Sequence, residues 1–238
     1  MTPAITIDPR FNGPEGSANG GYAAGRLAAH VDAEAVEVTL RRPPPLGRPL
    51  DVAAGPDGAR LLDGSELVAE ATAAELAADP PAPVSVAEAE AAVPGYIGFR
   101  GTPYPTCFVC GPGRADGDGL DIFAGPLADG RRAASPWTPA AEFAGPDGAV
   151  LPEFVWAALD CPSAMVVANE GALPAIVLGR FTARLIAPVR AGAPHVAVAW
   201  PLAQEGRKRE AGSAILTADG TLAAIARALW IELKAPAA

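Results

Sequence analysis

The chain has 238 residues, of which 50% are hydrophobic and 19% charged, so it can bury a substantial core and does not have the composition of a disordered chain. Its formal net charge of −9 argues against a protein that follows nucleic-acid phosphates, because that mode needs a basic face. The sequence has no run of about 18 apolar residues that would predict a membrane span, and no secretory signal pattern, so we expect a cytoplasmic globular protein.

The first part of the chain predicts a helix followed by an antiparallel meander. A short extended segment is expected at 5–11, a helix at 18–30, and a strand at 35–43, where apolar and polar side chains alternate. Turn sequences of the Gly-Pro-Asp-Gly and Asp-Gly type then separate further predicted strands. These strands are expected at 50–55, 59–64 and 66–76.

A proline-rich stretch at 78–95 interrupts this pattern and includes a predicted short helix at 85–92. It is typical of a connection between domains. We therefore expect a first unit at 1–78, a linker at 79–102 and a second unit at 103–238.

The second part of the chain repeats the same order of elements. Strand-like segments at 119–127 and 131–137 precede a helix at 152–168, in which Pro152 suits the first turn. A second meander of predicted strands follows at 176–189, 195–200, 206–220 and 221–233.

Two local echoes indicate an internal duplication. Residues 38–47 resemble residues 181–192, and residues 64–73 resemble residues 220–228. The repeat is too long for a solenoid unit, so two tandem domains fit better.

A helix followed by a twisted antiparallel meander, occurring twice, resembles the hotdog fold, in which a sheet wraps a central helix. The resemblance implies an α+β, tandem hotdog architecture. A closer likeness is to the phenylacetyl-CoA-thioesterase-like branch of the acyl-CoA thioesterases, which carries His-Gly-Gly at the start of the central helix. That branch has an acidic residue nine positions after the histidine.

This sequence divides that pattern between its two repeats. The first has Asn19-Gly20-Gly21, with Asn in place of His, and Ala28 at the acidic position. The second has Asp160 at the acidic position and no glycines at the helix start. The resemblance therefore implies one composite site, in which the glycines of one repeat face Asp160 of the other, and it implies a homodimer.

The chemistry of such a site follows from the residue types. The backbone amide of Gly21, with that of Gly20 as a second donor, at a helix N-terminus could stabilise the oxyanion of a thioester under attack, by about 3 kcal/mol. Asp160 could act as general base or nucleophile, and Asn19 could orient substrate or water. The alternatives are a simple turn or a tight packing position against the sheet at the glycines, and a partnered buried carboxylate at Asp160 just before Pro162.

Further residues are candidates for substrate binding. Tyr22 and Trp156, together with Phe154, would line an apolar site for a medium or aromatic acyl group. Glu153 shares a helix face with Asp160, although it is equally suited to be a first-turn acid. Basic side chains could receive the phosphates of coenzyme A, or could simply be solvated, and these are Arg180, Arg184 and the segment 206–210.

The cysteines give a weaker signal. Cys107 and Cys110 form one Cys-x-x-Cys, and only Cys161, His30 and His195 remain to complete a site that usually needs four ligands. We therefore expect no metal and no cofactor, with buried cysteines near the junction of the units. A zinc or redox site is the alternative.

The functional expectation is hydrolysis of an acyl-CoA-type thioester at the composite site, without a nucleic-acid or membrane partner. The alternative is a non-catalytic protein of the same fold that binds acyl-CoA or another small ligand. The chain contains neither a phosphate-binding loop of the Gly-x-x-x-x-Gly-Lys type nor a Gly-x-Ser-x-Gly nucleophile motif.

Overall fold

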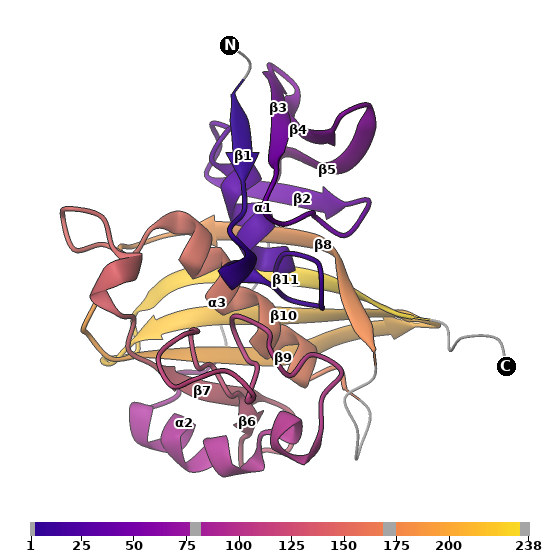
Figure 1. The fold of residues 1–238 in the computed structure, drawn as a ribbon. Helices are drawn as coiled ribbons and strands as arrows, with labels where there is room; N and C mark the ends of the chain where they lie inside the picture. The colour runs from indigo at the N-terminus through magenta and orange to yellow at the C-terminus, as the bar shows by residue number, and fades with distance from the viewer. Residues whose placement is uncertain (1–2, 77–81, 169–174, 234–238) are drawn as a thin grey trace, which may run out of the picture.

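A single antiparallel sheet organises the part of the chain that the computed structural model describes, which is residues 3–76, 82–168 and 175–233. Its eleven strands run in the order β1-β3-β4-β5-β2-β8-β11-β10-β9-β7-β6 (Figure 1). The boundary expected at 78/79 lies outside the described residues, and the three-part division of the chain stays a prediction.

The first part of the chain forms a helix and five strands, as its periodicity predicts. The segment expected to be extended at 5–11 contains a strand and a short 3-10 helix, Pro9–Phe11. The elements are β1 (Ala4–Thr6), α1 (Gly20–Ala28), β2 (Ala35–Leu40), β3 (Pro49–Gly55), β4 (Gly58–Asp63) and β5 (Glu66–Ala73).

The second part contains the remaining elements. The short helix expected at 85–92 is present with a Ser85 cap, and the helix expected at 152–168 begins at Pro152. The elements are α2 (Val86–Ala92), β6 (Gly125–Pro126), β7 (Ala133–Trp137), α3 (Pro152–Met165), β8 (Ile176–Leu185), β9 (His195–Glu205), β10 (Lys208–Thr217) and β11 (Leu222–Glu232).

The strand expected over 119–127 is wrong for most of its length. Only Gly125 and Pro126 pair in the sheet, and Asp121 has a φ of 52°. The amides of Leu120 and Ile122 bond instead to the carbonyls of residues 108 and 109. These bonds hold the segment against the Cys-x-x-Cys loop rather than in the sheet.

The strand order reads as two matching halves that meet at the β2–β8 pair. From this junction outwards, β2, β5, β4 and β3 correspond to β8, β11, β10 and β9. The two sequence echoes fall on corresponding strands, because 38–47 overlaps β2 while 181–192 overlaps β8, and 64–73 overlaps β5 while 220–228 overlaps β11. The topology thus agrees with an internal duplication.

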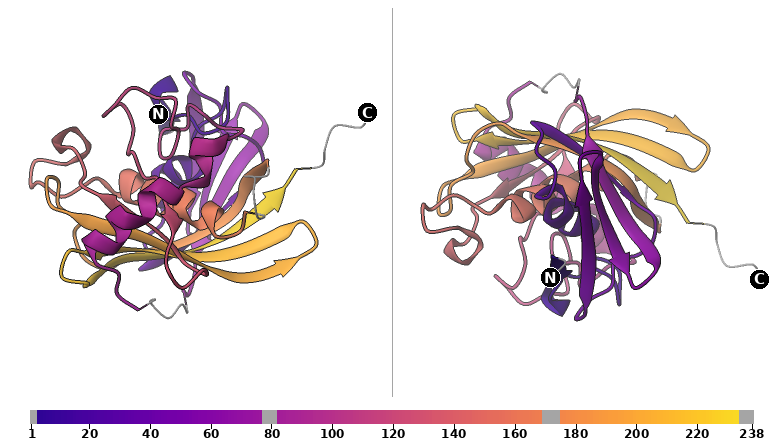
Figure 2. Two further views of the ribbon diagram at one scale, coloured as in Figure 1. Left: turned by 90° about the horizontal axis from the view of Figure 1, so that it is seen from below. Right: turned by 90° about the horizontal axis from the view of Figure 1, so that it is seen from above.

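The two halves enclose one core around α1 and α3. The sheet curves so that the first strands of the chain and the last ones lie on different sides of the two helices (Figure 2). The helices cross in antiparallel directions, since Gly21 lies against Asp160 and Gly25 lies against Glu153. This crossing places the N-terminus of α1 beside the middle of α3.

The helix α2 covers the outer face of the second half. Val84 and Ala89 pack with Ala134, Val198 and Leu216 in an apolar cluster separate from the main core. In β9 the neighbouring residue Ala197 faces the main core, as the alternation of a strand requires. None of the helices among the described residues is long and apolar enough to cross a membrane.

Candidate functional site

The start of α1 is shaped by its contact with α3. Asn19 caps the helix, and its side-chain oxygen accepts a bond of 2.8 Å from the Tyr22 amide. A Cβ atom at Gly21 would lie 2.5 Å from Asp160 Cβ and 2.7 Å from the Trp156 carbonyl oxygen. Glycine is therefore required at position 21 because the backbone of α1 touches α3 there. The tight packing expected as one alternative is real, and its partner is a helix.

Asp160 of α3 is fixed by the first residues of α1. Its Oδ2 accepts a 2.9 Å bond from the Gly21 amide and a 3.0 Å bond from Asn19 Nδ2. Its Oδ1 is buried without a hydrogen-bond partner among the described residues. Burial raises the pKa of Asp160 to about 7, and the bonds from Gly21 and Asn19 oppose that rise. The structure thus brings these three expected site residues into one cluster.

The two glycine amides have different roles from those expected of them. The Gly21 amide is bonded to Asp160, so it is not open to a substrate in this arrangement. The Gly20 amide has no protein acceptor in the described part of the chain, and Gly20 is partly exposed. The free donor at the start of α1 is therefore Gly20.

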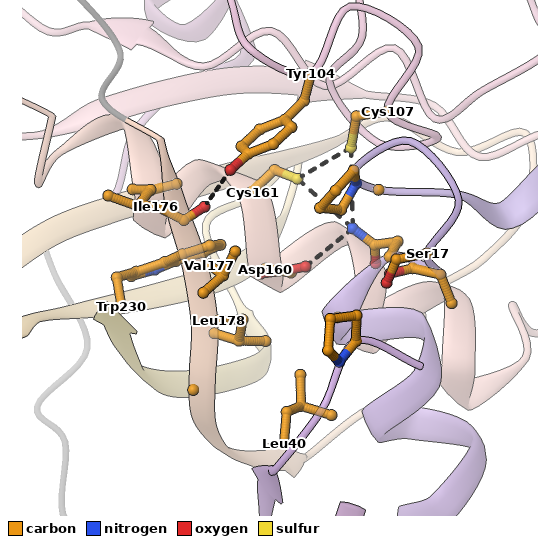
Figure 3. A pocket seen from close by; sticks show the side chains of 18 of the residues that line it. Ser17, Leu40, Tyr104, Cys107, Asp160, Cys161, Ile176, Val177, Leu178 and Trp230 are labelled. Carbon is orange, nitrogen blue, oxygen red and sulfur yellow. Dashed lines mark hydrogen bonds between the residues drawn. The ribbon is translucent and has the colours of Figure 1, made fainter. Parts of the chain in front are cut away.

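A cavity of about 550 Å³ opens beside Gly20 and Asp160. Apolar side chains of β2, β8 and β11 surround it, and the Asp160 carboxylate of α3 lies behind them (Figure 3). The Tyr104 hydroxyl donates a 3.0 Å bond to the Ile176 carbonyl at its wall. Its larger apolar lining residues are Leu40, Met165, Ile176, Leu178, Trp230 and Ile231.

The aromatic residues expected to line the site lie elsewhere among the described residues. Tyr22 stacks on Phe11 with ring centroids 4.4 Å apart, and Phe154 joins the same aromatic cluster. Trp156 packs edge-on against Phe181 and does not line the cavity. Helical periodicity correctly predicted that these side chains lie on apolar helix faces. Those faces pack against neighbouring side chains and do not face the cavity.

The charged residues expected to bind substrate also lie away from the cavity. Glu153 lies 3.9 Å from Arg26 at the α1–α3 crossing. Arg180 pairs with Glu37 of β2 at 3.5 Å, and Arg184 pairs with Glu34, the residue before β2, at 2.6 Å. The β8–β11 register shifts next to Gly179, so Arg180 does not continue the cavity-facing side of Leu178. Two arginines expected to receive phosphates are thus in surface ion pairs.

Other cationic residues lie at the cavity instead. Arg41 and Arg42 follow β2 and line the opening, where they pair with Glu70 and Glu66. Neither was among the predicted site residues. The run Arg-Arg-Pro-Pro-Pro, which begins inside the predicted strand 35–43 and marks its end, was the available signal.

The three cysteines gather at this same cavity. Cys107 and Cys110 come from the loop after α2, and Cys161 directly follows Asp160 in α3. The side-chain nitrogen of Asn19 lies 4.0 Å from the Cys107 sulfur and 3.8 Å from that of Cys161. The adjacency of Asp160 and Cys161 in the sequence was a signal that could have placed Cys161 at the site, whereas no sequence pattern indicated that the Cys-x-x-Cys lies there.

The corresponding position in the other half carries no acid. Ala28 lies eight residues after the first residue of α1, as Asp160 lies eight after Pro152. A second cavity of about 450 Å³ adjoins the start of α3, with Leu151, Pro152 and Ile186 among its lining. Of the two equivalent helix positions, 28 and 160, only position 160 therefore carries an acidic residue.

Comparisons with known proteins identify the fold. No protein-family model matches the sequence, and no curated relative matches it. A candidate thioesterase from Novosphingobium aromaticivorans is 13% identical with a TM-score of 0.61, over 98% of this chain and 95% of that one. A candidate thioesterase II from Thermobifida fusca is 16% identical with a TM-score of 0.58, over 97% of this chain and 92% of that one.

The TesB protein of Mycobacterium avium subspecies paratuberculosis is similar to the same extent. It is 14% identical with a TM-score of 0.57, over 96% of this chain and 91% of that one. These full-length similarities confirm the expected tandem hotdog fold.

Proposed function

We propose, on the premise that this chain has the double hotdog fold of solved thioesterase-like proteins, that it hydrolyses an acyl-CoA-type thioester beside Asp160. The observation that carries the proposal is the joint placement of the Asp160 carboxylate and the free Gly20 amide at one apolar cavity. A thioester needs a base or nucleophile for its carbonyl carbon and a donor for its carbonyl oxygen. Both groups are present, one from each half of the chain.

In the proposed reaction, Asp160 removes a proton from a water molecule while the water oxygen adds to the thioester carbonyl carbon. The Gly20 amide donates a hydrogen bond to the oxygen that becomes negative. The carbon–sulfur bond then breaks, and the leaving thiolate takes the proton held by Asp160. Direct attack by the carboxylate, followed by hydrolysis of the anhydride, uses the same two groups.

The surroundings of Asp160 suit this role. Its Oδ2 is held by Gly21 and Asn19, which fixes the orientation of the carboxylate. Its Oδ1 retains an unused acceptor. The apolar walls favour an uncharged acyl group, and Arg41 and Arg42 stand at the opening where an anionic acyl carrier would lie. A cytoplasmic location and a homodimer remain part of the proposal.

A non-catalytic binding protein is the second candidate. Asn19 stands where the resembled enzymes have histidine, and an amide cannot transfer a proton near neutral pH. The Asp160 Oδ2 is already bonded by two protein donors. Under this alternative the cavity binds the acyl-CoA without cleaving it.

The experiment is turnover of an acyl-CoA panel, followed as release of free thiol, by the wild type and Asp160→Asn. We expect the substitution to lower kcat by about 10²–10⁴-fold, because it removes the base and keeps the shape of the side chain. Ligand binding, measured by calorimetry with the same acyl-CoA, should change little.

The matched control is Glu153→Gln, which removes a carboxylate from the same helix outside the cavity. It should turn over substrate like the wild type. Binding without turnover by the wild type would favour the second candidate, and turnover retained by Asp160→Asn would exclude Asp160 as base or nucleophile.

A further inference from the structure

All three cysteines of the chain meet in one buried cluster. Their side-chain sulfurs lie within 4.8 Å of one another, and the Cys107 and Cys161 sulfurs are 3.7 Å apart. Cys107, Cys110 and Cys161 are 3%, 5% and 6% exposed. The sequence separates Cys161 from the Cys-x-x-Cys by more than fifty residues, so the fold itself assembles the cluster.

The loop that carries the first two cysteines is a tight turn. The Gly111 amide donates a 2.9 Å bond to the Cys107 carbonyl, and a Cβ at Gly111 would lie 2.4 Å from the Cys107 nitrogen. Glycine is therefore required at position 111 to close the turn, and the closed turn holds Cys107 and Cys110 together beside Cys161.

This geometry matches three thiolates around one ion. Zinc–sulfur bonds are about 2.3 Å long, which places the sulfurs of a shared zinc about 3.8 Å apart. We propose that Cys107, Cys110 and Cys161 form a three-thiolate site for a thiophilic metal ion, with Zn²⁺ as the ion to test first. The proposal goes beyond thioester hydrolysis and does not depend on it.

The site also has an open side and a means of offsetting its charge. All three cysteines line the 550 Å³ cavity, so a fourth ligand such as water could enter from there. Asn19 Nδ2 lies 4.0 Å from the Cys107 sulfur and 3.8 Å from the Cys161 sulfur, so its N–H groups face two of the three thiolates. Binding would release the thiol protons to solvent, so it should strengthen as pH rises.

The test is metal binding by the full chain, prepared under reducing conditions and stripped with chelator. After addition of Zn²⁺ and removal of the excess, elemental analysis should find about one zinc per chain. Addition of Co²⁺ instead should produce thiolate-to-cobalt charge-transfer absorption, which reports sulfur ligation directly. Each of Cys107→Ser, Cys110→Ser and Cys161→Ser should lower the affinity at least tenfold and weaken that absorption.

Two controls separate this result from misfolding and from the proposed activity. His30→Ala removes a soft ligand at the far end of α1 and should retain one zinc, and circular dichroism should show that the serine variants are folded. Asp160→Asn should also retain zinc, so the two proposals can fail independently. Less than about one tenth of an equivalent of metal in the wild type would overturn the proposal. So would serine variants that bind as the wild type does, or a Cys107–Cys161 disulfide in protein kept under reductant.

Discussion

The carboxylate of Asp160 is buried, and burial disfavours its charged form because that form loses its hydration. Its side chain is 2% exposed, and one of its two oxygens has no partner among the described residues. Burial raises its pKa to about 7 from an ordinary value of 3.8, with the amide of Gly21 opposing the rise. Because the folded-state pKa is the higher one, stability is greatest below the unfolded value and falls as pH rises towards 7.

Asp160→Asn should therefore remove a pH dependence of stability. Relative to the variant, metal-free wild type should lose about 3 kcal/mol of unfolding free energy between pH 4 and pH 8. Urea unfolding across that range measures the difference, and Glu153→Gln provides the matched comparison. Parallel stability curves for wild type and Asp160→Asn would show that the carboxylate is not desolvated in solution.

At the scale of the elements, the α1–α3 crossing determines which residues can stand at the site. The helices approach so closely that Gly21 lies against the Asp160 Cβ and the Trp156 carbonyl, and Gly25 lies against Glu153 and Trp156. The crossing brings the Asn19 cap and Asp160 together from positions 141 residues apart in the sequence.

Gly21→Ala should therefore be severely destabilising, by about 3 kcal/mol, because neither the Trp156 carbonyl nor the Asp160 backbone can move without shifting a helix. Thermal and urea unfolding measure the effect. Gly55→Ala is the control, since a Cβ there meets nothing within 4 Å. Equal stability of the two variants would mean that the helices are less closely packed than described.

The sequence predicted the elements better than it predicted the lining of the cavity. Periodicity located α1, α3 and the strands of both meanders, because burial of one face leaves a regular pattern. The same pattern cannot tell a face that packs on protein from one that lines a cavity. Tyr22 and Trp156, predicted to line the site, pack against Phe11 and Phe181. The pairing of Asn19 with Asp160 was accessible through the resemblance, whereas the cysteine cluster depends on a loop path that no local pattern encodes.

At the scale of the whole molecule, two repeats share one sheet and one core. Val36 pairs with Ala183 and Val38 with Phe181 across the β2–β8 junction, and all four side chains are buried. The helices α1 and α3 belong to the same apolar cluster. Neither half therefore has a complete core of its own.

Unfolding should accordingly be a single cooperative event. Native-state hydrogen exchange should give the amides of β4 and β5 the same opening free energy as those of β10 and β11, since loss of one half exposes the core of the other. A first half that loses protection at clearly lower denaturant would show two independent folding units.

The retained acid at Asp160 and the alanine at position 28 have a consequence for how this protein can change. A symmetric pair of identical subunits must accept every substitution twice, once at each of its equivalent places. Here each copy is encoded separately, so α1 can specialise as the donor of amides while α3 specialises as the bearer of the acid. Because the two halves are joined in one chain, they can carry different residues at equivalent positions, which identical subunits cannot do.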